Sequence, residues 1–151
     1  MEKNSQSVVR EDEVCVCFNL RKASRIVTQL YDDVMRPLGY RATQITLLGV
    51  IGRHEPVTVK SLAGFIDSDP TTLIRNLRLL EKEKLVKLEP GTDRRQRLAL
   101  LTVKGKQVLA KAYPVWKKTQ ERIAKQVGKD RLNRLLADLD QALETLRQGS
   151  G

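Results

Sequence analysis

The segment SLAGFIDSDPTTLIRNLRLLEKEKLV, residues 61–86, decides the fold. Near its centre, Asp69 offers a side-chain acceptor for a helix N-cap, and Pro70 follows at the position that proline favours in a first helical turn. The helix that starts there, 71–84, carries one apolar stripe made of Leu73, Leu77 and Leu80. A shorter helix that Thr58 can cap precedes it. Two such helices joined by a short break predict a helix-turn-helix.

A β hairpin is predicted directly after this helix. The apolar segments 85–88 and 98–100 flank the turn 90–93, Pro-Gly-Thr-Asp. Turn residues between two short apolar segments are typical of a hairpin. The tip is cationic because the turn is followed by Arg94, Arg95 and Arg97. Two short strands that follow a helix-turn-helix are called a wing, so this part of the chain predicts a winged helix-turn-helix.

Helices are predicted on both sides of this core. The first, 13–36, has apolar residues at spacings of three and four: Val16, Leu20, Ala23, Val27, Leu30 and Val34. A second helix, with Thr43 as its N-cap, follows. Beyond the wing, Thr102 can cap a long helix in which Pro114 predicts a kink or a break. Asp130 can cap a last helix that is rich in leucine. The fold class is therefore mainly α with a small β wing.

The predicted organisation has three parts. Residues 1–12 form a flexible N-terminus, and 37–105 form the winged helix-turn-helix DNA-binding domain. The segments 13–36 and 106–148 form a helical dimerisation region. These terminal helices carry more apolar side chains along one side than a domain of this size can cover, so we expect them to pack against a second copy of the chain. Packing of the helices against each other within one chain is the alternative.

Composition favours a polyanionic partner. The 151 residues include 28 Lys and Arg against 18 Asp and Glu, which gives a formal charge of +10. Such a charge suits nucleic acid or an anionic membrane face. We expect a cytoplasmic protein with no membrane partner, because no apolar stretch is long enough to span a bilayer and no signal peptide is visible. A basic scaffold that binds RNA or protein is a less favoured alternative, since aromatic residues make up only 4% of the chain.

Catalysis and metal binding are not expected. One histidine and two cysteines do not supply a structural zinc site. The chain shows no phosphate-binding glycine loop and no motif of a nucleophile or a metalloprotease. We therefore predict no catalytic residue, no metal and no cofactor.

The helix 71–84 has the residue types of a DNA-reading surface. Arginine can bind guanine, asparagine can bind adenine, and threonine can contact thymine methyl groups or phosphates. The free N–H groups of its first turn could also receive a phosphate. Residues 70–80 contain no acid, which favours DNA over an ordinary solvated helix. The candidate DNA contacts on this helix are Thr71, Thr72, Arg75, Asn76 and Arg78.

The wing supplies a second set of candidates. Arg94 and Arg97 suit insertion into a minor groove or contact with the DNA backbone. Asp93 could pair with Arg95 and so fix the turn with Arg94 pointing outward. An ordinary solvated hairpin is the alternative for this segment alone.

The same region resembles a known family. Residues 93–95, followed by Leu101-Thr102 and Gly105, have the order D-x-R…L-T-x-x-G, which is the wing signature of MarR-family winged-helix regulators. The similarity extends from Val14 to Leu146. It implies a homodimer held by its terminal helices on pseudo-palindromic promoter DNA. Members usually act as repressors that a ligand or oxidation releases.

Carried over by position, the resemblance assigns roles to individual residues. It implies that Arg94 enters the minor groove while Asp93 and Arg95 brace the wing. It also implies a set of residues that face the major groove: Thr71, Thr72, Arg75 and Asn76.

A cysteine near the N-terminus is a candidate sensor. Cys17 and Tyr31 match the peroxide-reactive cysteine and a tyrosine of the organic-hydroperoxide branch of the family. On one helix they lie about 21 Å apart, so they could meet only across a dimer interface. Arg21 and Ala42 depart from that branch, which has tyrosines there. In a regular helix Cys15 and Cys17 point about 200° apart and cannot form a disulfide without unwinding.

A peroxide sensor at this cysteine has two alternatives. Cys17 could be a small apolar residue packed in an interface, because free cysteines are commonly buried. The effector could then be a small organic molecule in a cleft rather than a peroxide.

Overall fold

The computed structural model describes residues 14–93 and 95–149. The chain forms two compact units, Met1–Ala112 and Tyr113–Gly151. The first unit holds, in chain order, α2 (Val16–Met35), the 3-10 helix η1 (Arg36–Leu38), α3 (Ala42–His54), β1 (Val57–Thr58), α4 (Val59–Phe65), α5 (Pro70–Lys82), β2 (Val86–Pro90), β3 (Arg97–Leu101) and the start of α6 (Val103–Val127). The second unit holds the rest of α6 and α7 (Lys129–Gln148).

The helix-turn-helix is formed by α4 and α5, as predicted. Thr58 caps α4, because its Oγ1 accepts a hydrogen bond from the Ser61 amide at 3.0 Å. Asp69 caps α5, and Pro70 is the first helical residue. The predicted leucine stripe of α5 is at most 1% exposed and consists of Leu73, Leu77 and Leu80.

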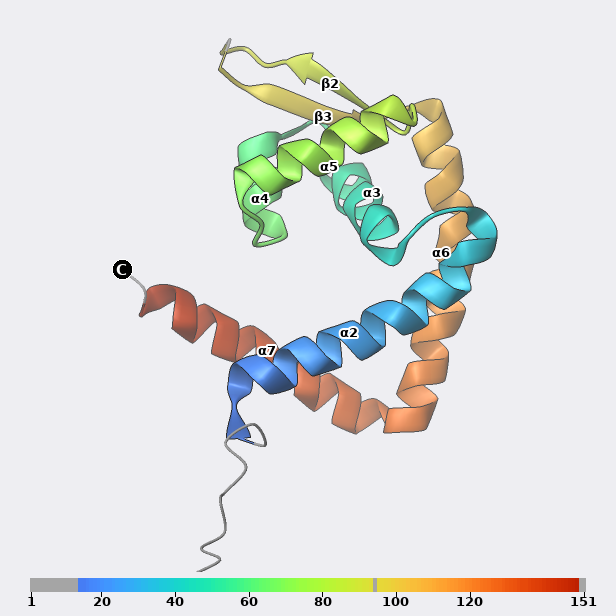
Figure 1. The fold of residues 1–151 in the computed structure, drawn as a ribbon, viewed down its shortest axis with the longest axis vertical. Helices are drawn as coiled ribbons and strands as arrows, with labels where there is room; N and C mark the ends of the chain where they lie inside the picture. Colours follow the sequence, from blue (N-terminus) through green and yellow to red (C-terminus); the bar gives the residue numbers. More distant parts are fainter. Residues whose placement is uncertain (1–13, 94, 150–151) are drawn as a thin grey trace, which may run out of the picture. The chain divides into compact units, whose positions relative to one another are not determined.

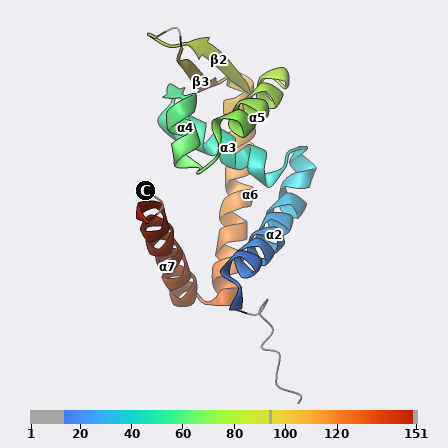
Figure 2. The same ribbon diagram turned by 60° about the vertical axis from the view of Figure 1, so that its left-hand side comes forward.

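The wing is part of a three-stranded antiparallel sheet with the order β1-β3-β2. Val86 pairs with Leu101 at one end of the β2–β3 hairpin, and Pro90 pairs with Arg97 at the other. In Figures 1 and 2 this hairpin projects beyond α4 and α5. The strand β1 was not predicted, because two residues are too few to show an alternating pattern.

One core holds these elements together. Helix α3 lies behind α5 in Figure 1 and contributes buried residues to the same core as the helix-turn-helix and the sheet. The largest side chains that are almost fully buried are Met35, Leu48, Ile51, Leu62, Leu73, Leu77, Leu80, Leu85 and Val86. All of them belong to the first unit, so this core is what positions α5 and the wing.

The start of α3 differs from the prediction. The helix begins at Ala42 with Arg41 as its N-cap, so the prediction of Thr43 as the cap is wrong. The cause is a tertiary contact, since Asp32 of α2 accepts a hydrogen bond from the Ala42 amide at 2.7 Å. A side chain ten residues away thus satisfies a free donor at the helix start.

Helix α2 also starts later than predicted. Cys15 has extended backbone angles and is the N-cap, with its Sγ accepting a hydrogen bond from the Phe18 amide at 3.4 Å. Cys15 therefore lies outside the regular helix. The angle of about 200° predicted for a regular helix therefore does not apply to Cys15 and Cys17.

Two predictions about the C-terminal helices need correction. Helix α6 runs through Pro114 as one helix, so the predicted break does not occur, whereas the predicted kink stays a prediction. Gly128, with a φ of +93°, is the N-cap of α7, so Asp130 lies in the first turn rather than at the cap. Glycine adopts such an angle without a steric penalty.

Candidate nucleic-acid interface

The outward side of α5 carries a basic ridge. Its members lie within about 60° of one another at 3.6 residues per turn, opposite the buried leucines. The ridge consists of Thr71, Arg75, Arg78 and Lys82, all exposed. Lys82 was not among the predicted contacts, although its spacing of seven from Arg75 would have placed it there. Thr72 is exposed and lies beside the ridge.

Asn76 lies to one side of this ridge. Together with Thr43 and Gln44 of α3, it lines a small hollow of about 80 Å³ between the two helices. The structure therefore separates Asn76 from the three ridge residues that were predicted with it. Asn76 thus lies on the side of α5 that is nearer to α3.

The first turn of α5 has no free N–H group to offer. Pro70 has none, and the Asp69 carboxylate accepts from the amides of Thr71 at 2.9 Å and Thr72 at 3.1 Å. The Leu73 amide donates to the Asp69 carbonyl. The expectation that the free N–H groups of this turn receive a phosphate is therefore wrong, because these amides already donate hydrogen bonds to Asp69. A contact with DNA from this turn has to come from side chains.

The same hydrogen bonds keep Asp69 ionised. The Thr72 hydroxyl, followed by the amides of Thr71 and Thr72, holds the pKa of Asp69 below its ordinary value. The Asp69 carboxylate thus lies beside the basic face of α5, and its oxygens accept hydrogen bonds from the backbone amides of Thr71 and Thr72.

Local hydrogen bonds shape the tip of the wing. Asp93 Oδ1 accepts from the Arg95 backbone amide at 3.0 Å, and the Asp93 carbonyl accepts from the Gln96 amide at 2.8 Å. Asp93 thus braces the turn through the main chain rather than through the Arg95 guanidinium. Arg94, a predicted contact, lies outside the described residues. Arg97 is exposed at the start of β3.

Among the described residues, Arg75, Arg78, Arg95 and Arg97 have no ion pair and are available to bind an anion. The ion pairs of the described residues are Asp33–Arg36, Lys87–Glu89 and Glu55–Lys106, and none of them includes a ridge or wing arginine. Lys87, which lies near the wing, is held by Glu89 at 2.6 Å. The positive charges of Arg75 and Arg78 on α5, and of Arg95 and Arg97 on the wing, are therefore not paired with an acid within the described part of the chain.

The predicted sensor residues both lie on α2. Cys17 is an exposed free thiol, and Tyr31 is half-buried, which raises the pKa of its phenol. The helix keeps them about 21 Å apart, so one chain does not bring them together. Cys15 is also an exposed free thiol.

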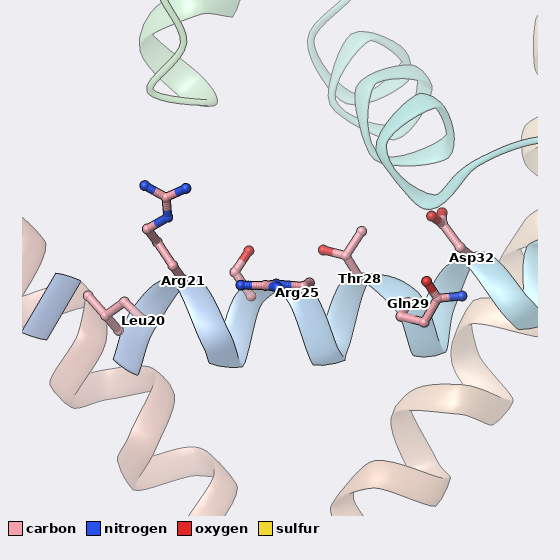
Figure 3. Close-up of a pocket in the computed structure, with 7 residues that line it drawn as sticks. Leu20, Arg21, Arg25, Thr28, Gln29 and Asp32 are labelled. Atoms are coloured by element: carbon pink, nitrogen blue, oxygen red, sulfur yellow. The ribbon is translucent and has the colours of Figure 1, made fainter. Parts of the chain in front are cut away.

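A shallow hollow of about 740 Å³ runs along α2. Figure 3 shows Arg21, Thr28 and Asp32 projecting from the same side of the helix, with Asp32 directed at the start of α3. Arg21 and Arg25 have no ion pair with any described residue. In residues 14–93 and 95–149 no three His, Cys, Asp or Glu side chains gather to hold a metal ion.

Comparison with known proteins identifies the family. The organic hydroperoxide resistance transcriptional regulator of Bacillus subtilis (strain 168) is 31% identical over 134 residues, which are 88% of this chain and 90% of that protein. The chain belongs to the MarR family of winged helix-turn-helix regulators. It is therefore a DNA-binding transcriptional regulator and not an enzyme.

Solved structures agree with this assignment. The M. tuberculosis regulator MosR, solved in complex with DNA, is 38% identical to this MarR-family chain, with a TM-score of 0.77 over 88% of this chain and 98% of that one. The MarR family regulator AbsC of Streptomyces coelicolor shares the fold at 22% identity, with a TM-score of 0.78 over 90% and 95% of the chains. The predicted fold class is confirmed. No family model matches the chain.

Proposed function

We propose that this MarR-family regulator is a cytoplasmic, homodimeric repressor that binds a pseudo-palindromic promoter site and leaves it when an effector acts. Among effectors we favour an organic hydroperoxide that oxidises Cys17. The observation that carries this choice is an exposed free thiol on α2, a helix with several exposed apolar side chains, in a chain that is 31% identical to an organic hydroperoxide resistance regulator.

Apolar side chains on α2 and α7 are exposed to water in the single chain, and a dimer would bury them. On α2, five such side chains are between 43% and 66% exposed: Val16, Phe18, Leu20, Ile26 and Val27. On α7, four leucines are between 42% and 62% exposed: Leu135, Leu136, Leu143 and Leu146. Exposed apolar side chains in this number favour an interaction surface. We assign the segments 13–36 and 106–148 to contacts between two copies.

The DNA-binding role is assigned to 37–105. A two-fold axis would present two α5 helices to successive major-groove faces, which suits a site with two similar halves. Arg75 and Arg78 of the ridge would then contact bases or phosphates, together with Thr71 and Thr72. Arg97 and Arg94 would contact the DNA backbone or the minor groove. Asp93 would brace the wing through the backbone amide of Arg95. Asn76 is retained as a contact at the edge of α5.

The proposed chemistry balances with a hydroperoxide as the only co-reactant. The Cys17 thiolate attacks the terminal oxygen of the hydroperoxide, an S–O bond forms and the O–O bond breaks. The sulfur is oxidised by two electrons to a sulfenic acid, and the alkoxide leaves and takes up a proton to become an alcohol. Tyr31 of a second copy, whose raised pKa keeps its phenol protonated, would donate a hydrogen bond to the sulfur. A polar group at this position of α2 would disturb the contacts of the helix with the second copy, loosen the dimer and release the DNA.

Fluorescence anisotropy tests this proposal. The probe is a labelled duplex from the region upstream of the gene, titrated with reduced protein and with protein treated with cumene hydroperoxide. We expect tight reduced-state binding that peroxide abolishes and a thiol reductant restores. Cys17→Ser should bind DNA and ignore peroxide, whereas Cys15→Ser serves as the matched thiol control and should still respond.

Several outcomes would overturn parts of the proposal. A Cys17→Ser protein that still responds to peroxide removes Cys17 as the sensor. Competition by single-stranded RNA or random duplex as effective as the upstream duplex would favour the basic scaffold instead. A monomer in sedimentation at the concentrations that bind DNA would remove the dimer.

A small organic anion is the second candidate effector. Arg21 and Arg25, which have no ion pair with any described residue, line the hollow on α2 beside the hydroxyl of Thr28. CouR, which shares the fold at 18% identity, has been solved with p-coumaroyl-CoA bound. If peroxide has no effect, aromatic carboxylates should be tested for release of the duplex. An Arg21→Ala, Arg25→Ala double variant should then lose that response, and an unchanged response would exclude this site.

A further inference from the structure

The C-terminal end of α5 is fastened to the first turn of α6. We call this set of contacts the α5–α6 joint and define it as residues 83–85 with 102–105. Lys104 Nζ donates a hydrogen bond to the Glu83 carbonyl at 2.9 Å. The Thr102 hydroxyl donates to the Lys84 carbonyl at 2.6 Å, and the Thr102 amide donates to the Leu85 carbonyl at 3.0 Å. Three consecutive carbonyls thus find partners on one short segment.

Glu83 is the C-cap of α5, so its carbonyl has no donor within the helix and another group must satisfy it. The carbonyls of Lys84 and Leu85 follow the helix in the chain. Lys84 also has a φ of +60°, a left-handed conformation that is unfavourable for a residue with a Cβ. The segment 83–85 therefore depends on its contacts with α6 to keep this path.

The joint is closely packed and is anchored from the other side. Gly105 lies so near the Leu85 carbonyl that a Cβ at 105 would come within 2.0 Å of that oxygen. Glu55, after α3, accepts from the Leu101 amide and from Lys106 Nζ, both at 2.8 Å. The first turn of α6 is thus held between the end of α3 and the end of α5.

We propose that Lys104 is a positioning residue that sets the orientation of α5 for sequence-specific DNA binding. This inference rests on the proposed role of α5 in reading DNA. The two ends of α5 have separate anchors, Asp69 at the start and the joint at the end. Loss of the Lys104 hydrogen bond frees the Glu83 carbonyl and lets the far end of α5 shift. Base contacts need placement to about 0.5 Å, whereas phosphate contacts tolerate such a shift.

The matched test compares two lysines of α6. Lys104→Met and Lys111→Met each remove one exposed positive charge from the same helix, but no described residue receives a hydrogen bond from Lys111. The measurement is the dissociation constant of the dimer for the upstream duplex and for a random duplex, each over a series of salt concentrations. We expect Lys104→Met to lower the ratio of specific to random affinity about three- to tenfold, in the range known for coupling residues. Lys111→Met should leave the ratio unchanged, and Lys104→Arg should restore it.

The salt dependence separates positioning from direct contact. A positioning residue leaves the slope of log affinity against log salt unchanged, whereas loss of a phosphate contact reduces it by about one. Equal ratios for the two methionine variants, or a reduced slope with an unchanged ratio for Lys104→Met, would overturn the inference. If wild-type protein itself does not prefer the upstream duplex, the proposed function fails instead.

A second variant keeps the inference testable if Lys104→Met proves unstable. Thr102→Val removes the hydroxyl that donates to the Lys84 carbonyl, while Thr102→Ser keeps it. We expect the valine variant to lower the specificity ratio and the serine variant to retain it, with both compared below their unfolding temperatures. Equal specificity ratios for the valine and serine variants would count against a joint that positions α5.

Discussion

The carboxylate of Glu55 accepts a hydrogen bond from the backbone amide of Leu101, with 2.8 Å between Oε2 and N. Its other oxygen accepts from Lys106 Nζ at 2.8 Å. One half-buried side chain therefore connects the end of α3 to the end of β3 and to the first turn of α6. Forty-six residues separate Glu55 from Leu101, so no local pattern in the sequence marks this connection.

Replacing Glu55 tests the strength of this connection. Burial opposes ionisation of Glu55, but the hydrogen bonds from Lys106 and Leu101, with the charges of Lys106 and Lys87, outweigh it and lower its pKa. A lowered folded-state pKa stabilises the protein above the ordinary carboxyl pKa, and this stabilisation is lost as pH falls through the folded value. We expect Glu55→Gln to reduce the free energy of unfolding by about 1–2 kcal/mol at neutral pH and to flatten its acid dependence.

Urea unfolding from acidic to neutral pH measures both effects. Glu89→Gln is the control, because its ion pair with Lys87 is largely exposed and should contribute little. If the two glutamine variants lose the same stability and keep the same pH dependence, Glu55 does not have the role assigned to it.

Gly105→Ala should be strongly destabilising. The new methyl group would lie 2.0 Å from the Leu85 carbonyl oxygen, and a carbonyl in the main chain cannot move aside as a flexible side chain can. We expect a loss of about 3 kcal/mol or more in the free energy of unfolding. Gly64→Ala on α4 is the matched control, since a Cβ there meets nothing within 4 Å, and it should gain about 0.4–1 kcal/mol. A Gly105→Ala protein as stable as Gly64→Ala would contradict the packing of the joint.

Local signals explain which features could be predicted from the sequence. Asp69-Pro70, the leucine stripe of α5 and the turn before Arg95 each act over a few residues, and the structure contains all three. The start of α3 could not be predicted, because Asp32 on another helix satisfies the Ala42 amide. The absence of free N–H groups at the start of α5 could have been predicted, because the sequence shows Asp69 as the N-cap. An N-cap carboxylate accepts hydrogen bonds from the first amides of its helix.

Asp69→Ala should weaken the start of α5. The variant loses the acceptor for two amides, and we expect a thermal midpoint lower by a few degrees. Asp69→Asn keeps a side-chain oxygen at the cap and should stay close to wild type at neutral pH. Because the Thr72 and Thr71 hydrogen bonds lower the pKa of Asp69, its contribution should persist above the ordinary aspartate pKa and fade as pH falls through the lowered value. Differential scanning calorimetry at several pH values measures this, and equal midpoints for the alanine and asparagine variants would speak against the cap.

The two edges of α5 should differ in their effect on DNA binding. Arg75 lies on the outward ridge, so Arg75→Ala should cost about 1–3 kcal/mol on the specific site and relax specificity there. Asn76 lies beside the hollow shared with Thr43 and Gln44, so Asn76→Ala should cost less on the same site. Arg97→Ala on the wing should weaken specific and random duplex alike and reduce the salt slope by about one, as for a phosphate contact. Anisotropy titrations of the three variants against upstream and random duplex distinguish these effects. A larger loss for Asn76→Ala than for Arg75→Ala would mean that α5 presents to DNA the edge nearer α3 rather than its basic ridge.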